Sequence, residues 1–318
     1  MKIYDKQVFL NGLTGDDLLG KIVREWFGNL ELAEGIETTE KEGTALGIVL
    51  APPGIDRIFL ESPGCSKVFD IGSINFDAIS QSRMFHFGYP PLLKKFYMNG
   101  GSQLLELFSK VRRLGVVTSL DFSLPDPETE SGKVDWPEIM KSVLPVTDIF
   151  VPSLEELMQI MWPSKYADIQ LACKNTDIID HIPIDMIRLL GKQIIDSGVK
   201  ILLIKMAHRG AYLITGDTTS LNEKLDSTLS KEWNYCELLC NAYQADKFKI
   251  KNATGAGDTA VAAFLAAILD SESPVSSLKY ATIAGRNNLY CHNIYSELAD
   301  WQTMTEEIKS EPNEIVSF

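Results

Sequence analysis

Seven residues near the C-terminus combine the residue types and the spacing that phosphate chemistry requires. The segment Asn252–Asp258 reads Asn-Ala-Thr-Gly-Ala-Gly-Asp, and an apolar, almost uncharged run follows it directly. Gly255, Ala256 and Gly257 carry little side-chain bulk, so their backbone N–H groups can converge on an anion at the positive end of a helix. Asp258 would lie beside that anion, where a carboxylate can take the proton from a hydroxyl group that attacks phosphorus.

Two other interpretations of this turn compete with phosphate transfer. The first is an ordinary loop in which Asp258 stabilises the first turn of a helix through the helix dipole. The second is the dinucleotide-binding template, which the spacing Gly255-x-Gly257-x-x-Ala260 also fits. That template needs an acidic residue about 20 positions further on, where this chain has Ser-Ser-Leu-Lys at 276–279. We therefore reject dinucleotide binding, whereas the ordinary loop stays open.

The segment Gly15–Ile22 approaches a second phosphate-binding template, the P-loop, but fails it chemically. Ile22 stands where the template needs a hydroxyl group for Mg²⁺. Asp16 and Asp17 would also place two negative charges inside a phosphate cradle. We interpret this segment as a turn followed by a helix cap.

Composition and charge are those of an acidic globular protein. The 318 residues include 43 acidic and 30 basic side chains, for a formal net charge of −13. This charge disfavours binding to nucleic acids and to anionic membranes, which are polyanions themselves. The longest strictly apolar run, Ala260–Leu269, is about half of a membrane span. Five scattered cysteines suit a reducing compartment, so we expect a cytoplasmic protein without nucleic-acid or membrane partners.

Short apolar runs alternate with helical periodicity along the chain, which is typical of a βα fold around a parallel sheet. Two prolines and a glycine at 52–54 predict a hairpin turn, and the segments 163–180 and 216–233 are the least regular. The predicted strands are Gln7–Asn11, Thr44–Leu50, Arg57–Glu61, Met84–Phe87, Val116–Asp121, Asp148–Val151, Lys200–Met206 and Ala211–Thr215, with a further β-leaning run at Lys247–Ile250. The predicted helices are Asp17–Gly28, Ser102–Leu114, Leu154–Met161, Ile184–Ser197, Thr259–Leu269 and Val275–Cys291.

Several segments together resemble the ribokinase/PfkB family of ATP-dependent carbohydrate kinases. The second signature of that family, Asp-Thr-x-Gly-Ala-Gly-Asp, resembles residues 252–258, with Asn252 and Ala253 in its first two positions. The similar segments occur in the family's order and span about residues 8 to 295. The others are the Gly-Asp-Asp turn at Thr14–Gly20, the hairpin at 43–64, the Asn-x-x-Glu motif at Ser153–Glu156 with Ser in place of Asn, and the nucleotide-side strand and turn at Ile204–Gly210.

The resemblance implies a three-layer α/β/α sandwich with a mostly parallel central sheet, formed by one kinase domain over residues 1–318. The hairpin at 44–62 would form an edge and a partial β lid. The implied reaction transfers the γ-phosphate of MgATP to a sugar hydroxyl, with Asp258 as base and the amides of Gly255–Gly257 as anion hole. The implied cofactor residues are Glu156 for the water shell of Mg²⁺, and Lys205, Gly210, Thr254 and Thr282 for the nucleotide.

Departures from the family pattern leave alternatives open. Family members carry a sugar-binding Asp on a first strand, and lid strands, before the Gly-Asp-Asp turn, whereas Met1 lies just before that turn. The resemblance therefore implies that the sugar-defining segment is lacking. Asn252 replaces a carboxylate associated with a monovalent-cation site, so a requirement for K⁺ stays open. Three functions remain as candidates: a sugar kinase, a nucleoside kinase and a nucleotide-binding pseudokinase. The chain could form a homodimer. Glu156 could also lie on a solvated helix face without a role in the site.

Overall fold

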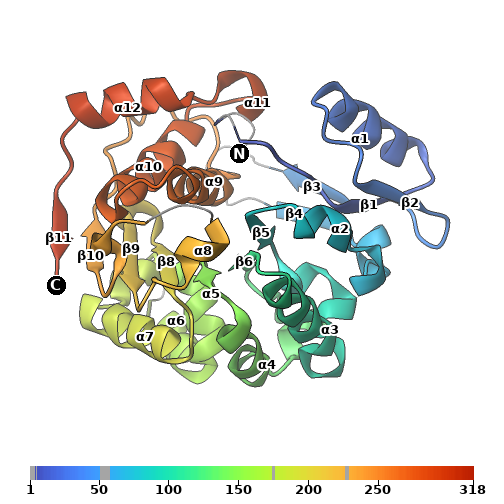
Figure 1. Cartoon of the computed structure of the whole chain (residues 1–318), viewed down its shortest axis with the longest axis horizontal. Helices are drawn as coiled ribbons and strands as arrows, with labels where there is room; N and C mark the ends of the chain where they lie inside the picture. The colour runs from blue at the N-terminus through green and yellow to red at the C-terminus, as the bar shows by residue number, and fades with distance from the viewer. Residues whose placement is uncertain (1–3, 5, 51–57, 174–175, 226–228) are drawn as a thin grey trace.

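A computed structural model describes residues 4, 6–50, 58–173, 176–225 and 229–318 of the chain. The strands of its main sheet are β5 (Met84–Phe87), β6 (Val117–Leu120), β7 (Ile149–Phe150), β8 (Ile201–Lys205), β9 (Ala211–Thr215), β10 (Glu237–Cys240) and β11 (Ile315–Ser317). Their order in space is β11-β10-β9-β8-β7-β6-β5 (Figure 1). Strands β5 to β8 are mutually parallel, whereas β9 and β11 run antiparallel to their neighbours. The mostly parallel sheet that the sequence predicts is therefore confirmed.

Helices cover both faces of this sheet (Figure 1). Successive strand side chains point to opposite faces, so Leu202 and Ile204 pack into one core whereas Ile201 and Leu203 pack into another. This alternation confirms the α/β/α sandwich. The first layer holds α3 (Lys94–Arg113), α4 (Trp136–Val143), α5 (Leu154–Met161), α6 (Pro163–Cys173) and α7 (Ile184–Asp196), and the second α8 (Leu221–Leu225), α9 (Ala256–Leu269), α10 (Pro274–Asn288), α11 (Ile294–Glu297) and α12 (Trp301–Ser310).

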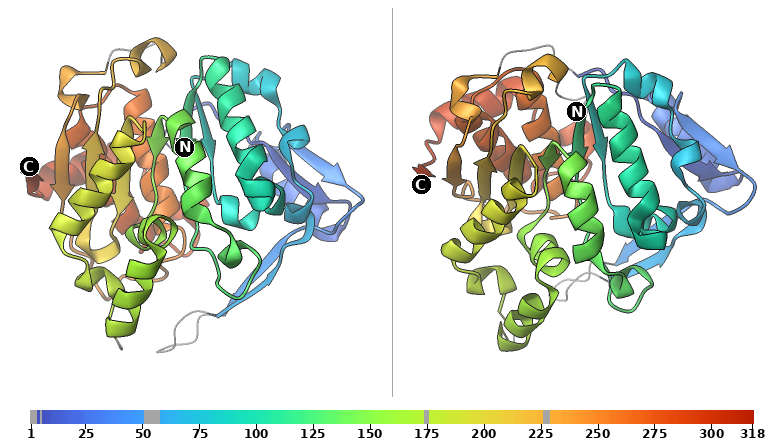
Figure 2. Two further views of the ribbon diagram at one scale, coloured as in Figure 1. Left: turned by 90° about the horizontal axis from the view of Figure 1, so that it is seen from below. Right: turned by 60° about the horizontal axis from the view of Figure 1, so that its bottom comes forward.

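The N-terminal part of the chain forms two small sheets of its own beside the β5 end of the main sheet (Figure 2). Its elements are β1 (Gly12–Gly15), α1 (Leu18–Asn29), β2 (Ile36–Thr39), β3 (Leu46–Leu50), β4 (Ile58–Ser62) and α2 (Phe76–Ser80). Strands β1 and β2 pair in parallel, and β3 and β4 form an antiparallel hairpin. The hairpin predicted over 44–62 therefore forms, while its turn at 51–57 lies outside the described residues. Asp17 caps α1, because its carboxylate accepts the N–H of Gly20 at 2.8 Å.

Four local predictions are wrong. Residues Gln7–Asn11 are irregular, and the strand begins only at Gly12. Strand pairing begins there, because Gly12 pairs with Ile36 of β2. The run Lys247–Ile250 is a turn, since the carboxylate of Asp246 accepts the N–H of Phe248 at 3.0 Å and competes with a strand. The segments 163–180 and 216–233, both expected to be irregular, contain α6 and α8.

Helix α3 joins a short, unpredicted first segment, Lys94–Tyr97, to the helix that the sequence predicts. Its backbone is non-helical at residues 98–101, where Asn99, Gly100 and Gly101 have left-handed angles, so the regular helix begins at Ser102, as predicted, and ends at Arg113. The Gly-Gly pair accommodates this kink because glycine has no Cβ to clash at positive φ. Within the described part of the chain, no helix is both long and apolar enough to span a bilayer.

Candidate active site

The Gly-Ala-Gly-Asp turn opens helix α9, as its sequence predicts. Gly255 is the N-cap residue, with φ +80° and ψ 0°, and Asp258 lies in the first helical turn. Ala256 donates its N–H to Ala253 O at 3.3 Å, and the N–H groups of Gly257 and Asp258 lie in the first turn, where a helix leaves its amides without acceptors inside the helix. Open amides at the positive end of a helix form an anion site. The turn therefore has the geometry that phosphate binding needs.

The end of α10 holds this turn in place. Asn288, which is 1% exposed, donates from Nδ2 to the carbonyl oxygen of Thr254 at 3.0 Å. Its Oδ1 accepts the hydroxyl of Thr259 at 2.8 Å, and the N–H of Lys251 donates to Leu289 O at 2.7 Å. The turn is thus pinned on both sides by one buried amide. Thr254, predicted to line the nucleotide, contributes its carbonyl group to this clamp.

Four consecutive parallel strands each direct a polar side chain toward this end of α9. Tyr89 follows β5, Asp121 follows β6, Glu156 follows β7 in the first turn of α5, and Lys205 ends β8. Because the carboxyl ends of parallel strands lie at the same edge of a sheet, ligands of open α/β sheets bind there. The sequence predicts Glu156 and Lys205 as site residues, and the structure adds Tyr89 and Asp121.

Lys205 lies between a buried carboxylate and the anion turn. Its Nζ is 2.7 Å and 3.0 Å from the two carboxylate oxygens of Asp121, which is 2% exposed. Burial raises the pKa of Asp121, and the nearby ammonium opposes this rise. The same Nζ is 3.8 Å from the position that a Cβ atom on Gly257 would occupy. An ammonium beside the open amides adds positive charge where a phosphate would lie.

Glu156 has a clear structural role and a raised pKa. Its Oε2 accepts the N–H of Ser153 at 2.6 Å, and the hydroxyl of Ser153 accepts the N–H of Glu156 at 3.3 Å, which forms a capping box for α5. Burial raises the pKa of Glu156 to about 7, although Lys205 opposes the shift and Asp121 adds to it. A nearby cation would favour its carboxylate form.

The carboxylates at this edge suit a metal that is held mainly by water and phosphate. Among the residues that the structure describes, no group of three or more His, Cys, Asp or Glu side chains is arranged to hold a metal ion. Mg²⁺ keeps several waters and often takes only one or two protein carboxylates together with substrate phosphates. Glu156, with its raised pKa, fits such an outer role, whereas a closed protein cage does not fit here.

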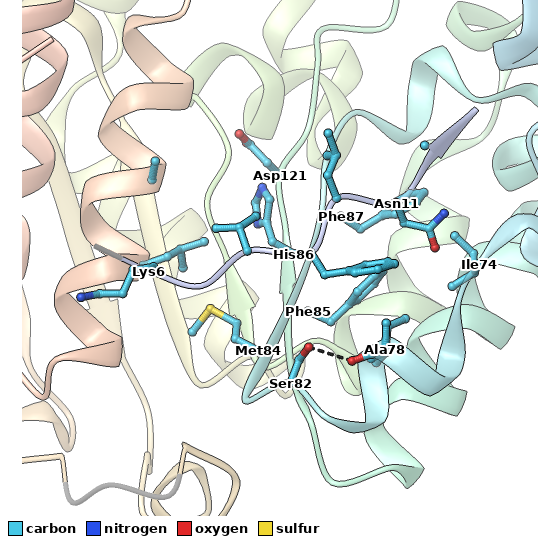
Figure 3. A pocket seen from close by; sticks show the side chains of 18 of the residues that line it. Lys6, Asn11, Ile74, Ala78, Ser82, Met84, Phe85, His86, Phe87 and Asp121 are labelled. Carbon is cyan, nitrogen blue, oxygen red and sulfur yellow. Dashed lines mark hydrogen bonds between the residues drawn. The ribbon is translucent and has the colours of Figure 1, made fainter. Parts of the chain in front are cut away.

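A cavity of about 1300 Å³ opens beside Asp258. Its walls include Asp121, His86 and residues 6–13, which cross in front of β5 (Figure 3). Asp258 is exposed to this cavity, and one of its oxygens, Oδ1, accepts the hydroxyl of Tyr89. The ring of His86 is fixed through Nδ1, 2.9 Å from the hydroxyl of Ser119. A bound acceptor in this cavity would reach the carboxylate of Asp258.

Two predicted nucleotide residues adjoin the end of β10. Gly210 has φ +90°, and a Cβ atom there would lie only 2.0 Å from the carbonyl oxygen of Cys240, so the backbone itself requires glycine. The hydroxyl of Thr282 donates to the carbonyl oxygens of Leu278 and Lys279, each at 3.0 Å, and lies 3.4 Å from the Cys240 sulfur. Both residues have local structural roles, and their part in nucleotide binding stays a prediction.

Three residues of the site are absent from the sequence-based prediction. Asp121 is the last residue of a predicted strand, so its place at the ligand-binding edge of the sheet could have been predicted. Tyr89 precedes two prolines and so belongs to a turn, but nothing local relates it to Asp258, which lies 169 positions further on. Asn288 lies inside a helical pattern, and only the tertiary structure shows its contact with the anion turn.

Comparisons with known proteins place the fold. No family model and no curated protein matches the chain. Among solved structures, ribokinase from Thermotoga maritima aligns at TM-score 0.66 and 13% identity, covering 97% of this chain and 83% of that chain. Fructokinase with bound ATP from Xylella fastidiosa aligns at 0.70 and 17%, covering 97% and 87%. Nucleoside kinase from Methanocaldococcus jannaschii aligns at 0.66 and 15%, covering 97% and 83%.

These likenesses show that the chain has the ribokinase fold. The resemblance that the sequence motifs suggest is therefore confirmed at the level of architecture. The three similar structures carry different names, those of a ribokinase, a fructokinase and a nucleoside kinase.

Proposed function

We propose that this chain is an ATP-dependent phosphotransferase that moves the γ-phosphate of MgATP to a hydroxyl group of a sugar or nucleoside. The observation that carries the proposal is the position of Asp258, which lies directly beside the open amides of α9 and faces a cavity. A carboxylate next to an anion site is repulsive unless it has a chemical role, and accepting the proton of an attacking hydroxyl is such a role. The proposal treats residues 1–318 as one kinase domain with β3 and β4 as a partial lid.

The chain's own groups would divide the work as follows. The open amides at the start of α9 would bind the phosphate that is transferred, and Lys205 would stabilise its negative charge. Asp258 would take the proton of the acceptor hydroxyl at a carboxylate oxygen. Mg²⁺, when bound, neutralises charge on the phosphates of the nucleotide. Glu156 would hold the water shell of that ion.

A second candidate is a pseudokinase that binds nucleotide without phosphorylating an acceptor. Two observations favour it. The cavity beside Asp258 has a volume of about 1300 Å³, which exceeds the usual 300–1,000 Å³ range of ligand pockets, so little holds a small acceptor in place. Asp258 also already accepts a hydrogen bond from Tyr89. Both candidates share the nucleotide site and differ only at the acceptor.

The test is an acceptor screen with the full chain and Asp258→Asn. MgATP is supplied with a panel of pentoses, hexoses and nucleosides, and phosphorylated product is measured by mass spectrometry. We expect one class of acceptor to be phosphorylated and the substitution to lower turnover by about 10²–10⁴-fold. The affinity for MgADP, measured by calorimetry, should change little because the base acts on the transition state. The exposed Asp168→Asn on α6 is the matched control.

Each result separates the candidates. Nucleotide binding without phosphorylation of any acceptor supports the pseudokinase. Full activity in Asp258→Asn removes Asp258 as the base. No binding of MgATP or MgADP at millimolar concentration contradicts both candidates.

A further inference from the structure

Tyr89 holds an unusual backbone conformation at the edge of the candidate site. It has φ +59° and ψ +52°, in the left-handed region that non-glycine residues rarely adopt. The next residues, Pro90 and Pro91, are buried in a short 3₁₀ helix, and the N–H of Leu92 donates to Tyr89 O at 3.0 Å. Residues in this region are held there by their surroundings and cluster at functional sites.

The conformation brings the phenol to the candidate base. The hydroxyl of Tyr89 donates a hydrogen bond to Oδ1 of Asp258. Burial raises the pKa of Tyr89, and the negative charges of Asp258, Asp121 and Glu156 raise it further. The phenol is therefore a neutral O–H donor at any physiological pH. Like the hydroxyl group of an acceptor alcohol, it is a neutral O–H group that can donate a hydrogen bond to the base.

An acceptor hydroxyl and the Tyr89 hydroxyl therefore compete for Oδ1 of Asp258. A general base must lie within hydrogen-bond reach of the proton that it removes. The cavity next to Asp258 is large enough to admit water, and water in contact with the base would attack a bound nucleotide in place of an acceptor. The tethered phenol keeps water from Oδ1 of Asp258, the oxygen to which it donates.

We propose that Tyr89 is a gate: it occupies the acceptor's place at Asp258, suppresses ATP hydrolysis in the absence of acceptor, and is displaced when an acceptor binds. This inference rests on the proposed function, because it assigns Asp258 as the base. The left-handed backbone favours displacement, since leaving that conformation relieves strain. Tyr89 is thus a positioning residue that sets the coupling between ATP consumption and transfer.

The experiment measures ADP formation by the full chain with MgATP and no acceptor. Tyr89→Phe removes only the hydroxyl group, and we expect it to raise this hydrolysis by about tenfold or more, the size expected for losing a hydrogen bond to a carboxylate. The double variant Tyr89→Phe with Asp258→Asn should return to the low rate. Tyr97→Phe, a buried tyrosine on α3 outside the cavity wall, is the control and should leave hydrolysis unchanged.

A second variant guards against a folding defect. Tyr89→Gly removes the phenol and permits the positive φ without strain, so it should also raise hydrolysis. Intact mass after incubation with MgATP is recorded in parallel. Transfer of phosphate to Tyr89 itself would show the phenol as an acceptor and overturn the gate.

Calorimetry with MgADP distinguishes failure of the gate from failure of the proposed function. Nucleotide binding equal to wild type in Tyr89→Phe and Tyr89→Gly, with hydrolysis no higher than wild type, overturns the gate alone. Absence of nucleotide binding in the wild type overturns the proposed function and the gate together.

Discussion

The part of the molecule that carries the site and the N-terminal part use apolar residues in opposite ways. In the site-bearing part, Phe264 and Ile268 of α9 are 0% exposed and pack against the sheet. In the N-terminal part, Leu18 and Ile22 of α1 are 73% and 53% exposed, and every residue of β3 is exposed. The groups of the proposed site therefore lie on elements that packing fixes, whereas the N-terminal elements are held by few buried contacts.

The proposed function gives this difference a reason. A base and an anion site must keep a fixed geometry, because small displacements of reacting groups have large effects on rate. Elements that admit and release an acceptor need freedom to move. The contrast between α9 and α1 agrees with this division of tasks.

Truncation of one large side chain in each part tests the contrast most strongly. Phe264→Ala should lower the free energy of unfolding by about 3–5 kcal/mol, because it leaves a cavity in a close-packed core. Ile22→Ala should lower it by about 0.5 kcal/mol or less, since the side chain is mostly hydrated already. Urea unfolding followed by circular dichroism measures both. Equal effects would show that α1 packs as tightly as α9.

Lys205→Met should destabilise the site-bearing part by about 3 kcal/mol, because it leaves the carboxylate of Asp121 buried without its partner. The double variant Lys205→Met with Asp121→Asn should recover most of that loss, since no uncompensated charge remains. Unfolding by urea again supplies the measurement. A single variant as stable as wild type would mean that Asp121 is already protonated in the native protein.

Glu156→Gln should change the pH dependence of stability. Burial raises the pKa of Glu156 in the folded protein to about 7. Above pH 7 the buried carboxylate is charged and lowers the stability of the fold. This loss disappears as the pH falls from 7 toward the pKa of Glu in the unfolded chain, because the carboxylate becomes protonated. In metal-free buffer the variant should be more stable than wild type at pH 8, by about 1–3 kcal/mol. The difference should vanish below about pH 4.5.

Thermal or urea unfolding at both pH values tests this prediction. The exposed Glu128→Gln serves as the control and should show no such trend. A constant difference between pH 8 and pH 4.5 would contradict the raised pKa of Glu156.

Much of the main sheet is predictable from local patterns. Strand β5, helix α5 and strand β9 begin and end at the predicted residues, because each combines a short apolar pattern with turn or cap residues at its ends. Strand β10 has no comparable local signal and exists through pairing with β9 and β11. The Gln7–Asn11 prediction fails for the same reason, since an apolar run without a partner strand does not form a sheet.

The candidate site divides in the same way. The phosphate turn at 255–258 is predictable, because small residues, an acid and an apolar helix are contiguous in the sequence. The pairing of Lys205 with Asp121 joins residues 84 positions apart, and no pattern in either segment indicates the other. The contact of Tyr89 with Asp258 is likewise set by the order of the strands.

The strand order also bears on how the chain reaches this structure. From β5 to β10 every strand pairs with the strand that follows it in the sequence. Each new pairing then closes one loop onto an existing edge, so the entropy lost at each step stays small compared with a sheet whose strands interleave. The sheet can grow in one direction during synthesis, from β5 toward β10. The anion turn, which follows β10, is placed only after the four strand ends that face it have been ordered.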